Sequence, residues 1–179
     1  MSFIQIVPIK LSETLGLTRL QEAVKKAFNI EAVISNSAID ISDTYNHQRN
    51  QYHSSKLLIK LKGMKSEEAI KIIGVTELDL FVPILTFVFG EAQLKGDASV
   101  ISALRLKNQF YGLPEDRKLM TERICKEAVH ELAHNFGLLH CGDYRCVMKS
   151  STYVEDIDIK SIDLCPACKK LLLGPLKNL

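Results

Sequence analysis

The run from His130 to Met148 contains the side chains most able to do chemistry in this chain. His130 and His134 are four residues apart, so on an α-helix they lie one turn apart on the same face and their ring nitrogens can converge on one metal ion. Gly137 can adopt the left-handed backbone conformation that ends a helix, which would turn the chain and return His140 toward the same ion. The spacing therefore predicts a metal site with His130, His134 and His140 as ligands.

Three neutral imidazoles leave one position of a tetrahedral zinc ion open, which is typical of catalytic zinc rather than structural zinc. Glu131 directly follows the first ligand and points about 100° round the helix from it, near enough to a zinc-bound water to accept its proton. Zinc lowers the pKa of such a water to about 7, so a carboxylate can complete the deprotonation at neutral pH. Glu131 is the candidate general base, and amide hydrolysis is the implied reaction.

The histidine pattern is longer than the five-residue His-Glu-x-x-His run, and the added positions make a chance match much rarer. A His-Glu-x-x-His run alone occurs often in unrelated proteins. Requiring Gly137 and His140 at their positions as well reduces chance matches by about two or more orders of magnitude on ordinary residue frequencies. The longer pattern therefore favours a real metal site.

Four of the five cysteines form two pairs near the C-terminal end: Cys141, Cys146, Cys165 and Cys168. The later pair lies in a Cys-Pro-Ala-Cys knuckle, whose spacing lets both thiolates bind one tetrahedral ion. The four side chains predict a structural zinc site. Because His140 and Cys141 are adjacent, consecutive residues would serve two metals and tie the end of the active-site helix to the C-terminal segment.

Two other interpretations of these cysteines remain open. A disulfide needs an oxidising compartment, and the sequence begins without a signal-peptide pattern. A dithiol redox centre should follow a strand early in a βαβ unit, whereas this knuckle lies close to the C-terminal end. The odd cysteine, Cys125, lies about 140° round the helix from His130 and is expected to be a small buried thiol.

The run from His130 to Met148, followed by the later cysteine pair, resembles the archaemetzincins, a family within the metzincin zinc peptidases. The resemblance implies that the three histidines bind catalytic zinc, that Glu131 is the base, and that Met148 forms a turn beneath the metal. It also implies a second zinc ion bound by Cys141, Cys146, Cys165 and Cys168. Two zinc ions per chain are therefore expected, one catalytic and one structural.

The resemblance extends upstream over most of the chain, through short stretches of residues: 45–46, 49–52, 74–76, 79–80, 87–92 and 100–102. It implies a cleft between a sheet and the C-terminal part, with the strand at Ala98 to Leu104 as its upper edge. An extended peptide could add to that edge through backbone hydrogen bonds. Ordinary sheet packing is an equal alternative for this strand.

The order of apolar and turn residues predicts an α/β (α+β) fold, with helices packed on a mostly parallel twisted sheet. We expect a long active-site helix that begins at Glu115 and Asp116 and ends at Gly137, and an irregular C-terminal part held by zinc. The expected strands are 3–9, 32–35, 70–75, 85–89 and 98–104, and the other expected helices are 17–28, 52–61 and 166–173.

The length of 179 residues suits one catalytic domain over residues 1–179, with an upper subdomain at 1–137 and a lower subdomain at 138–179. A net charge of +2 and 25% charged residues give no strong basic field, so nucleic acid is not expected as a partner. The longest apolar run, residues 78–90, is interrupted and too short to span a membrane. A monomer in the cytoplasm is expected.

These observations favour a zinc metallopeptidase that acts on a peptide or protein substrate. The first alternative is a zinc-binding scaffold of the same fold that binds peptides or partners with little or no proteolysis. The second is a zinc-knuckle interaction module, in which the four cysteines matter and His130→Ala leaves function intact. The first two hypotheses share the same metal sites, so they differ only in what Glu131 does.

Overall fold

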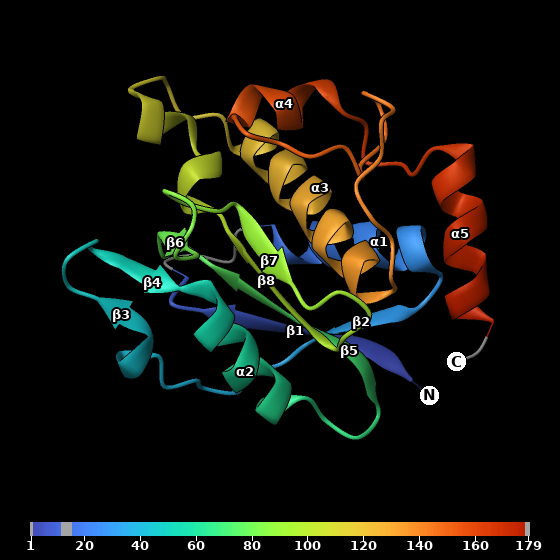
Figure 1. Cartoon of the computed structure of the whole chain (residues 1–179), viewed down its shortest axis with the longest axis horizontal. Helices are drawn as coiled ribbons and strands as arrows, with labels where there is room; N and C mark the ends of the chain where they lie inside the picture. The colour runs from blue at the N-terminus through green and yellow to red at the C-terminus, as the bar shows by residue number, and fades with distance from the viewer. Residues whose placement is uncertain (1, 12–15, 178–179) are drawn as a thin grey trace.

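The computed structural model describes residues 2–11 and 16–177. It is built around a five-stranded sheet, whose strands run through the middle of the molecule (Figure 1). The strand order is β2-β1-β5-β8-β7, and every neighbouring pair is parallel except β7 with β8. In chain order the strands are β1 (Phe3–Ile9), β2 (Glu31–Ile34), β5 (Ala69–Thr76), β7 (Gly90–Ala92) and β8 (Ala98–Ser102). The prediction of a mostly parallel sheet is confirmed.

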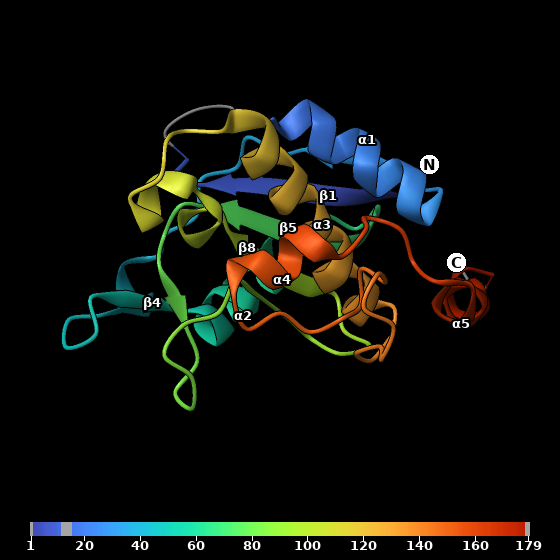
Figure 2. The same ribbon diagram turned by 90° about the horizontal axis from the view of Figure 1, so that it is seen from above.

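The central strands are buried on both faces, as near-continuous apolar runs predict for a parallel sheet. All five residues of β8 are buried, and so are most residues of β1 and β5. The helices α1 (Leu17–Phe28) and α3 (Arg117–Asn135) pack against each other on one face of the sheet. The helix α2 (Ser54–Met64) covers the opposite face. Figure 2 shows α1 and α2 on opposite sides of the strands.

A small second sheet, which the sequence analysis did not predict, has the order β3-β4-β6. Its strands are β3 (Tyr45–Asn46), β4 (Gln51–His53) and β6 (Leu80–Phe81), and the 3-10 helix η1 (Ser42–Thr44) precedes it. The predicted helix at 52–61 therefore begins two residues late, at Ser54. Tyr52 is extended because its amide donates to the Asp79 carbonyl at 2.8 Å.

The predicted strand at 85–89 is wrong, because this segment consists mostly of bends that follow a turn. The Leu85 amide donates to the Val82 carbonyl at 3.0 Å, which closes a turn around Pro83. Val88 forms an isolated bridge with Leu80, and the Phe89 carbonyl accepts from the Ser102 amide of β8 at 2.8 Å, just before β7 begins. The strand that follows the turn is β7, which covers one side of β8. The upper edge of the sheet is therefore β7, and the prediction that the strand at 98–104 forms this edge is also wrong.

Strand β8 ends at Ser102, earlier than predicted, because the chain then coils into two 3-10 helices, η2 (Leu104–Leu106) and η3 (Asn108–Tyr111). The Ala103 amide donates to the Thr76 carbonyl at 2.7 Å, which is the last backbone bond of this segment to β5. The following residues lead over the sheet to the start of α3.

Helix α3 begins and ends with recognisable capping motifs. The Asp116 carboxylate accepts the Leu119 amide at 2.9 Å, so Asp116 is the N-cap and the helix begins at Arg117. At the other end the amides of Gly137 and Leu138 donate to His134 and Ala133, and Gly137 has a φ of 95°. This pair of bonds is a Schellman motif, so the predicted end at Gly137 is confirmed.

The C-terminal part contains two helices, α4 (Val154–Ile159) and α5 (Pro166–Leu176), whereas the sequence predicted only the second. Arg123 of α3 holds α4 in place through two bonds of 2.7 Å to the Asp158 carboxylate. None of the helices within residues 2–11 and 16–177 is long and apolar enough to cross a membrane.

We predict that Asp116→Ala lowers the stability of the protein by about 1 kcal/mol, because the first turn of α3 loses its N-cap acceptor. A chemical denaturation curve measures this change. Glu115→Ala is the matched control, since Glu115 is exposed and pairs with exposed Arg117, and such surface pairs contribute little. Equal stability of the two variants would contradict the assigned cap.

Candidate metal centre

Two side-chain clusters in the described chain could each hold a metal ion: His130, His134 and His140, and Cys141, Cys146, Cys165 and Cys168. In each cluster, all the potential ligand atoms lie within 4.8 Å of one another. The histidines come from α3 and from the loop after its Schellman end. Their burial falls along the chain: His130 is buried, His134 is half-buried and His140 is exposed. The cluster therefore opens to solvent on the His140 side.

Backbone carbonyls fix the tautomers of the two helical histidines. Nδ1 of His130 lies 2.8 Å from the Val147 carbonyl, and Nδ1 of His134 lies 2.7 Å from the Leu138 carbonyl. A carbonyl oxygen can only accept, so both Nδ1 atoms carry the hydrogen and both Nε2 atoms carry a lone pair. These two Nε2 atoms face each other at 3.1 Å. Two lone pairs at that distance repel, and a cation between them removes the repulsion, so the residues fit a metal ion.

Electrostatics favour the neutral, metal-binding form of these rings. Burial lowers the pKa of His130 well below its ordinary value, and the charge of Lys160 lowers it further. Burial also lowers the pKa values of His134 and His140. All three imidazoles are therefore neutral near pH 7, as zinc ligands must be.

Glu131 lies on α3 directly beside these ligands and is buried. Burial raises the pKa of Glu131 well above its ordinary value, and the charge of Glu127 adds to this effect. A Cβ atom on Gly90 would lie 2.7 Å from Cγ and from Oε1 of Glu131, and 2.9 Å from the Val100 carbonyl oxygen. The Glu131 side chain therefore fills the space that a side chain on β7 would need.

A cleft of about 300 Å³ opens over the histidine cluster. Its floor contains Glu127, His130, Glu131 and His140. One wall is the segment 85–90 before and at the start of β7, and the other is the segment 150–152 after Met148. A chain segment of the substrate could therefore lie between two backbone walls, with the imidazoles and the two carboxylates beneath it.

Side chains hold the outer part of the first wall, at Leu85 and Thr86. Nη2 of Arg49 donates to the carbonyls of Leu85 and Thr86 at 2.6 and 3.0 Å. Nε2 of Gln51 also donates to the Thr86 carbonyl, at 2.9 Å. The carbonyls of a turn that lacks strand partners are thereby satisfied, which explains how the turn keeps its shape.

Asp79 and Arg105 extend this network to the aromatic part of the wall. Asp79 accepts two bonds from Arg105, at 2.7 and 2.8 Å, and one from Gln51 at 3.0 Å. The Arg105 guanidinium lies over the Phe87 ring, 4.2 Å from its centroid, and Phe87 contacts Phe89 edge to face. The network thus links the second sheet to the side chains that line the cleft.

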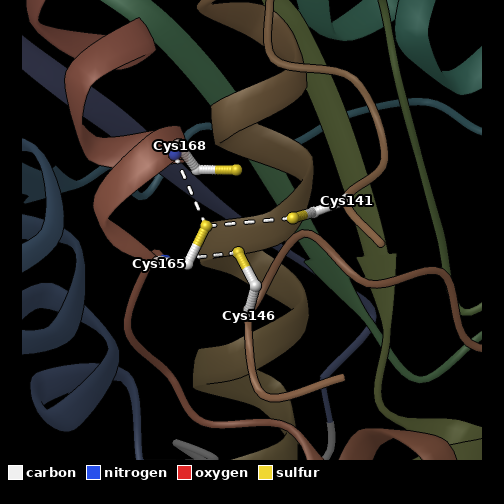
Figure 3. Close-up of side chains that lie close together, drawn as sticks. All are labelled: Cys141, Cys146, Cys165 and Cys168. Carbon is white, nitrogen blue, oxygen red and sulfur yellow. Dashed lines mark hydrogen bonds between the residues drawn. The ribbon is translucent and has the colours of Figure 1, made fainter. Parts of the chain in front are cut away.

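The four cysteines form the second cluster (Figure 3). Sγ of Cys141 lies 3.8 Å from Sγ of Cys165. Zinc–sulfur bonds of about 2.3 Å in a tetrahedron place two sulfurs about 3.8 Å apart. Backbone amides also point at the sulfurs: Cys165 donates to Sγ of Cys146 at 3.3 Å, and Cys168 donates to Sγ of Cys165 at 3.5 Å.

These features fit a metal better than the alternatives. All five cysteines are free, so the disulfide interpretation finds no support. The Cys168 amide lowers the pKa of Cys165, whereas burial raises the pKa of Cys146 and of Cys168. A redox pair would involve two sulfurs, whereas here four sulfurs converge on one point. The set is complete for a closed tetrahedral site.

The two clusters are linked through the turn that contains Met148. The Cys141 amide donates to the Met148 carbonyl at 2.9 Å, and the preceding carbonyl, that of Val147, accepts from His130. Met148 itself is fully buried in the main core. Cys125 is buried as predicted, and burial raises its pKa to about 11, so it is an unreactive thiol.

Sequence reasoning missed several residues in and around the cleft. Glu127 looks like an ordinary charged residue of a helix, and Lys160 looks like a surface lysine, yet both are buried. Arg49, Gln51 and Asp79 lie in the stretches that carry the upstream resemblance, but their spacing indicates no role. Only the long-range hydrogen bonds bring them to the cleft wall.

Comparisons with known proteins point to one family. A model of the family described as Peptidase family M54 matches residues 15–173. The chain is 43% identical to the archaemetzincin of Methanocaldococcus jannaschii over 128 residues, which cover 72% of this chain and 69% of that protein.

Two solved structures have a similar fold over nearly the whole chain. The crystal structure of archaemetzincin from Methanopyrus kandleri matches with a TM-score of 0.87 and 34% identity, covering 98% of this chain and 96% of that one. The crystal structure of a zinc-dependent peptidase from Methanocorpusculum labreanum matches with a TM-score of 0.85 and 29% identity, covering 94% and 99% of the two chains. The predicted fold class and family resemblance are confirmed.

We predict that Gly90→Ala destabilises the protein by about 1–3 kcal/mol, the usual cost of overpacking a filled site. The new Cβ meets the Val100 backbone as well as Glu131, so the strand has no simple way to relax. Denaturant unfolding measures the effect.

Gly63→Ala is the matched control, because Gly63 lies in α2 with no atom within 4 Å of a new Cβ. It should keep or slightly raise stability, since alanine favours the helix. If Gly90→Ala were as stable as this control, the contact between β7 and Glu131 would be refuted.

Proposed function

Because the chain belongs to Peptidase family M54, the archaemetzincins, we propose that it is a zinc-dependent metallopeptidase that hydrolyses peptide bonds. The observation that carries the proposal is the convergence of three neutral imidazoles and one buried carboxylate at the floor of a cleft beside a sheet edge. We propose His130, His134 and His140 as the ligands of the catalytic zinc. Zinc bound there would supply Lewis-acid polarisation of the scissile carbonyl and a more acidic water.

In this proposal Glu131 is the catalytic acid and base. A carboxylate oxygen of Glu131 would accept the proton that the attacking water loses and pass it to the leaving amine. Its position directly after His130 and its packing against Gly90 support this role, because they aim the carboxylate at the cleft floor. The buried environment keeps bulk water from competing for the proton.

We propose that strand β7 holds the substrate. The carbonyl of Phe89 and the amide of Gln93 bond to β8, at 2.8 and 3.0 Å. In an antiparallel pair, alternate residues turn their amides and carbonyls to the other side, so those of Gly90 and Ala92 face the free edge of the sheet. An extended peptide could bind there by strand addition, with its scissile bond over the histidines.

We propose that the cysteine cluster holds a structural zinc ion, so that the chain binds two zinc ions. The residues 1–179 would form one catalytic domain that acts as a monomer, with residues 1–137 as its upper and 138–179 as its lower subdomain. Met148 would provide the turn beneath the catalytic zinc, which its burial supports. The cytoplasmic location remains a prediction.

We predict that zinc-loaded protein cleaves members of a diverse peptide library and that Glu131→Gln reduces cleavage by about 10²–10⁴-fold, the usual contribution of general acid–base catalysis. Glutamine has the same shape but cannot take the proton. Mass spectrometry of the library measures the cleavage, and zinc analysis of the variant should still give two ions per chain.

Glu155→Gln, at an exposed position of α4, is the control and should cleave like the wild type. No cleavage by any form, or equal cleavage by wild type and Glu131→Gln, would favour the zinc-binding scaffold. Loss of function by cysteine variants alone, with His130→Ala fully functional, would favour the interaction module.

We predict that the double variant Cys165→Ser, Cys168→Ser binds one zinc ion fewer and that amide hydrogen exchange in α5 becomes faster. The closed cluster is what connects α5 to the turn after α3, so its loss removes that constraint. Cys125→Ala, outside the cluster, should keep both ions and the wild-type exchange of α5. Unchanged exchange in the double variant would show that apolar packing alone holds α5.

A further inference from the structure

A buried ion pair lies next to the histidine cluster. Nζ of Lys160 is 2.9 Å from Oε1 of Glu127, and the two side chains are only 1% and 4% exposed. Oε1 of Glu127 has no hydrogen bond of good geometry, although the ammonium is close. Charge attraction, rather than a directed hydrogen bond, therefore joins the two groups.

The pair brings together three segments of the chain. Glu127 is on α3, Lys160 follows the last residue of α4, and Nζ of Lys160 also donates to the carbonyl of Lys149 at 3.2 Å. Lys149 directly precedes the cleft wall at 150–152. Glu127 lines the cleft floor, and Lys160, which is not among the lining residues, lies behind it.

Stability alone does not explain two buried charges at this place. Taking both ions out of water is costly, and apolar side chains of similar volume usually pack as stably. The presence of two charges in the core therefore suggests a role other than stability. The neighbouring histidine cluster indicates that role.

Both charges lie close to the ligands of the proposed catalytic metal. Glu127 is three residues before His130 and four before Glu131, so all three lie on one side of α3. Glu127 lines the same cleft floor as His130 and His140, and Nζ of Lys160 lies 2.9 Å from the Glu127 carboxylate, so both charges lie close to the metal position. The pair is thus a fixed dipole beside the metal position.

We propose that Glu127 and Lys160 are positioning residues that set the affinity of the histidine cluster for its divalent cation, Glu127 raising it and Lys160 limiting it. Glu127 is the nearer group to the cleft and attracts a cation; Lys160 cancels part of this attraction and keeps Glu127 in place without ligating the metal. The inference rests on the proposed zinc site, but it does not require that the protein cleaves peptides.

The opposing signs distinguish this role from a purely structural one. Glu127→Gln leaves the Lys160 charge uncompensated, so the cation should bind about tenfold more weakly, in the range found when groups behind metal ligands are changed. Lys160→Met leaves the carboxylate uncompensated, so the cation should bind about tenfold more tightly. The double variant should return close to the wild-type dissociation constant.

The measurement is a titration of metal-free protein with Co²⁺ and then competition with Zn²⁺. Thiolate-to-cobalt absorption reports the cysteine cluster separately, so its dissociation constant is an internal reference that should be the same in all variants. Lys160→Arg keeps the charge and should bind like the wild type. If Lys160→Met does not fold, Lys160→Gln retains a donor for the Lys149 carbonyl and should also bind the cation more tightly.

If the ion pair had only a structural role, both single variants would bind the cation more weakly, or neither would change. The double variant would then not recover the wild-type dissociation constant. Either pattern overturns the inference, as does a wild-type histidine cluster that binds no divalent cation. Opposite shifts in a protein that cleaves no peptide would keep this inference and reject the peptidase proposal, so the two can fail separately.

Discussion

The end of α3 at Gly137 is the constraint on which the rest of the site depends. An α-helix rises about 1.5 Å per residue, so histidines four residues apart can share a metal, but a third ligand two turns on would be more than 10 Å along the axis from the first. The third imidazole must therefore come from outside the helix. The Schellman bonds and the φ of 95° at Gly137 turn the chain back within a few residues and bring His140 into the cluster.

A second constraint follows, because a loop that carries a ligand needs support of its own. The carbonyls of residues 147–149 accept, in chain order, from Nδ1 of His130 at 2.8 Å, from the amide of Cys141 at 2.9 Å and from Nζ of Lys160 at 3.2 Å. One turn thus orients the first candidate ligand, fixes the residue after the third candidate ligand and accepts a hydrogen bond from the buried lysine. The cysteine cluster anchors the same turn through Cys146. The same turn therefore both positions the candidate ligands and orders the C-terminal part.

The sequence was sufficient where function depends on local spacing, and insufficient where it depends on distant contacts. Helical periodicity and ligand spacing predict the histidine and cysteine clusters, and the conformational freedom of glycine predicts the helix end at Gly137. The wall at 85–90 could not, because its apolar residues resemble a strand until the carbonyl bonds from Arg49 and Gln51 are known. For the same reason β7 was missed as the sheet edge. Lys160 is the clearest example of what the sequence does not predict. Its burial is explained by its ion pair with Glu127 on α3, which the sequence does not reveal.

The gradient of burial across the cluster indicates from which side a substrate of the proposed peptidase would arrive. His130 and Glu131 are buried on α3, whereas His140 is exposed, so the open coordination position of the proposed zinc would face the cleft on the His140 side. Gly90 makes this arrangement possible, because any side chain there would occupy the space of the Glu131 carboxylate. The residue that lets Glu131 reach the floor also lies on the free edge of the sheet, where its backbone groups face outward. The proposed catalytic group and the proposed peptide-binding edge therefore meet at a single glycine, and that contact would set the distance between a bound backbone and the carboxylate.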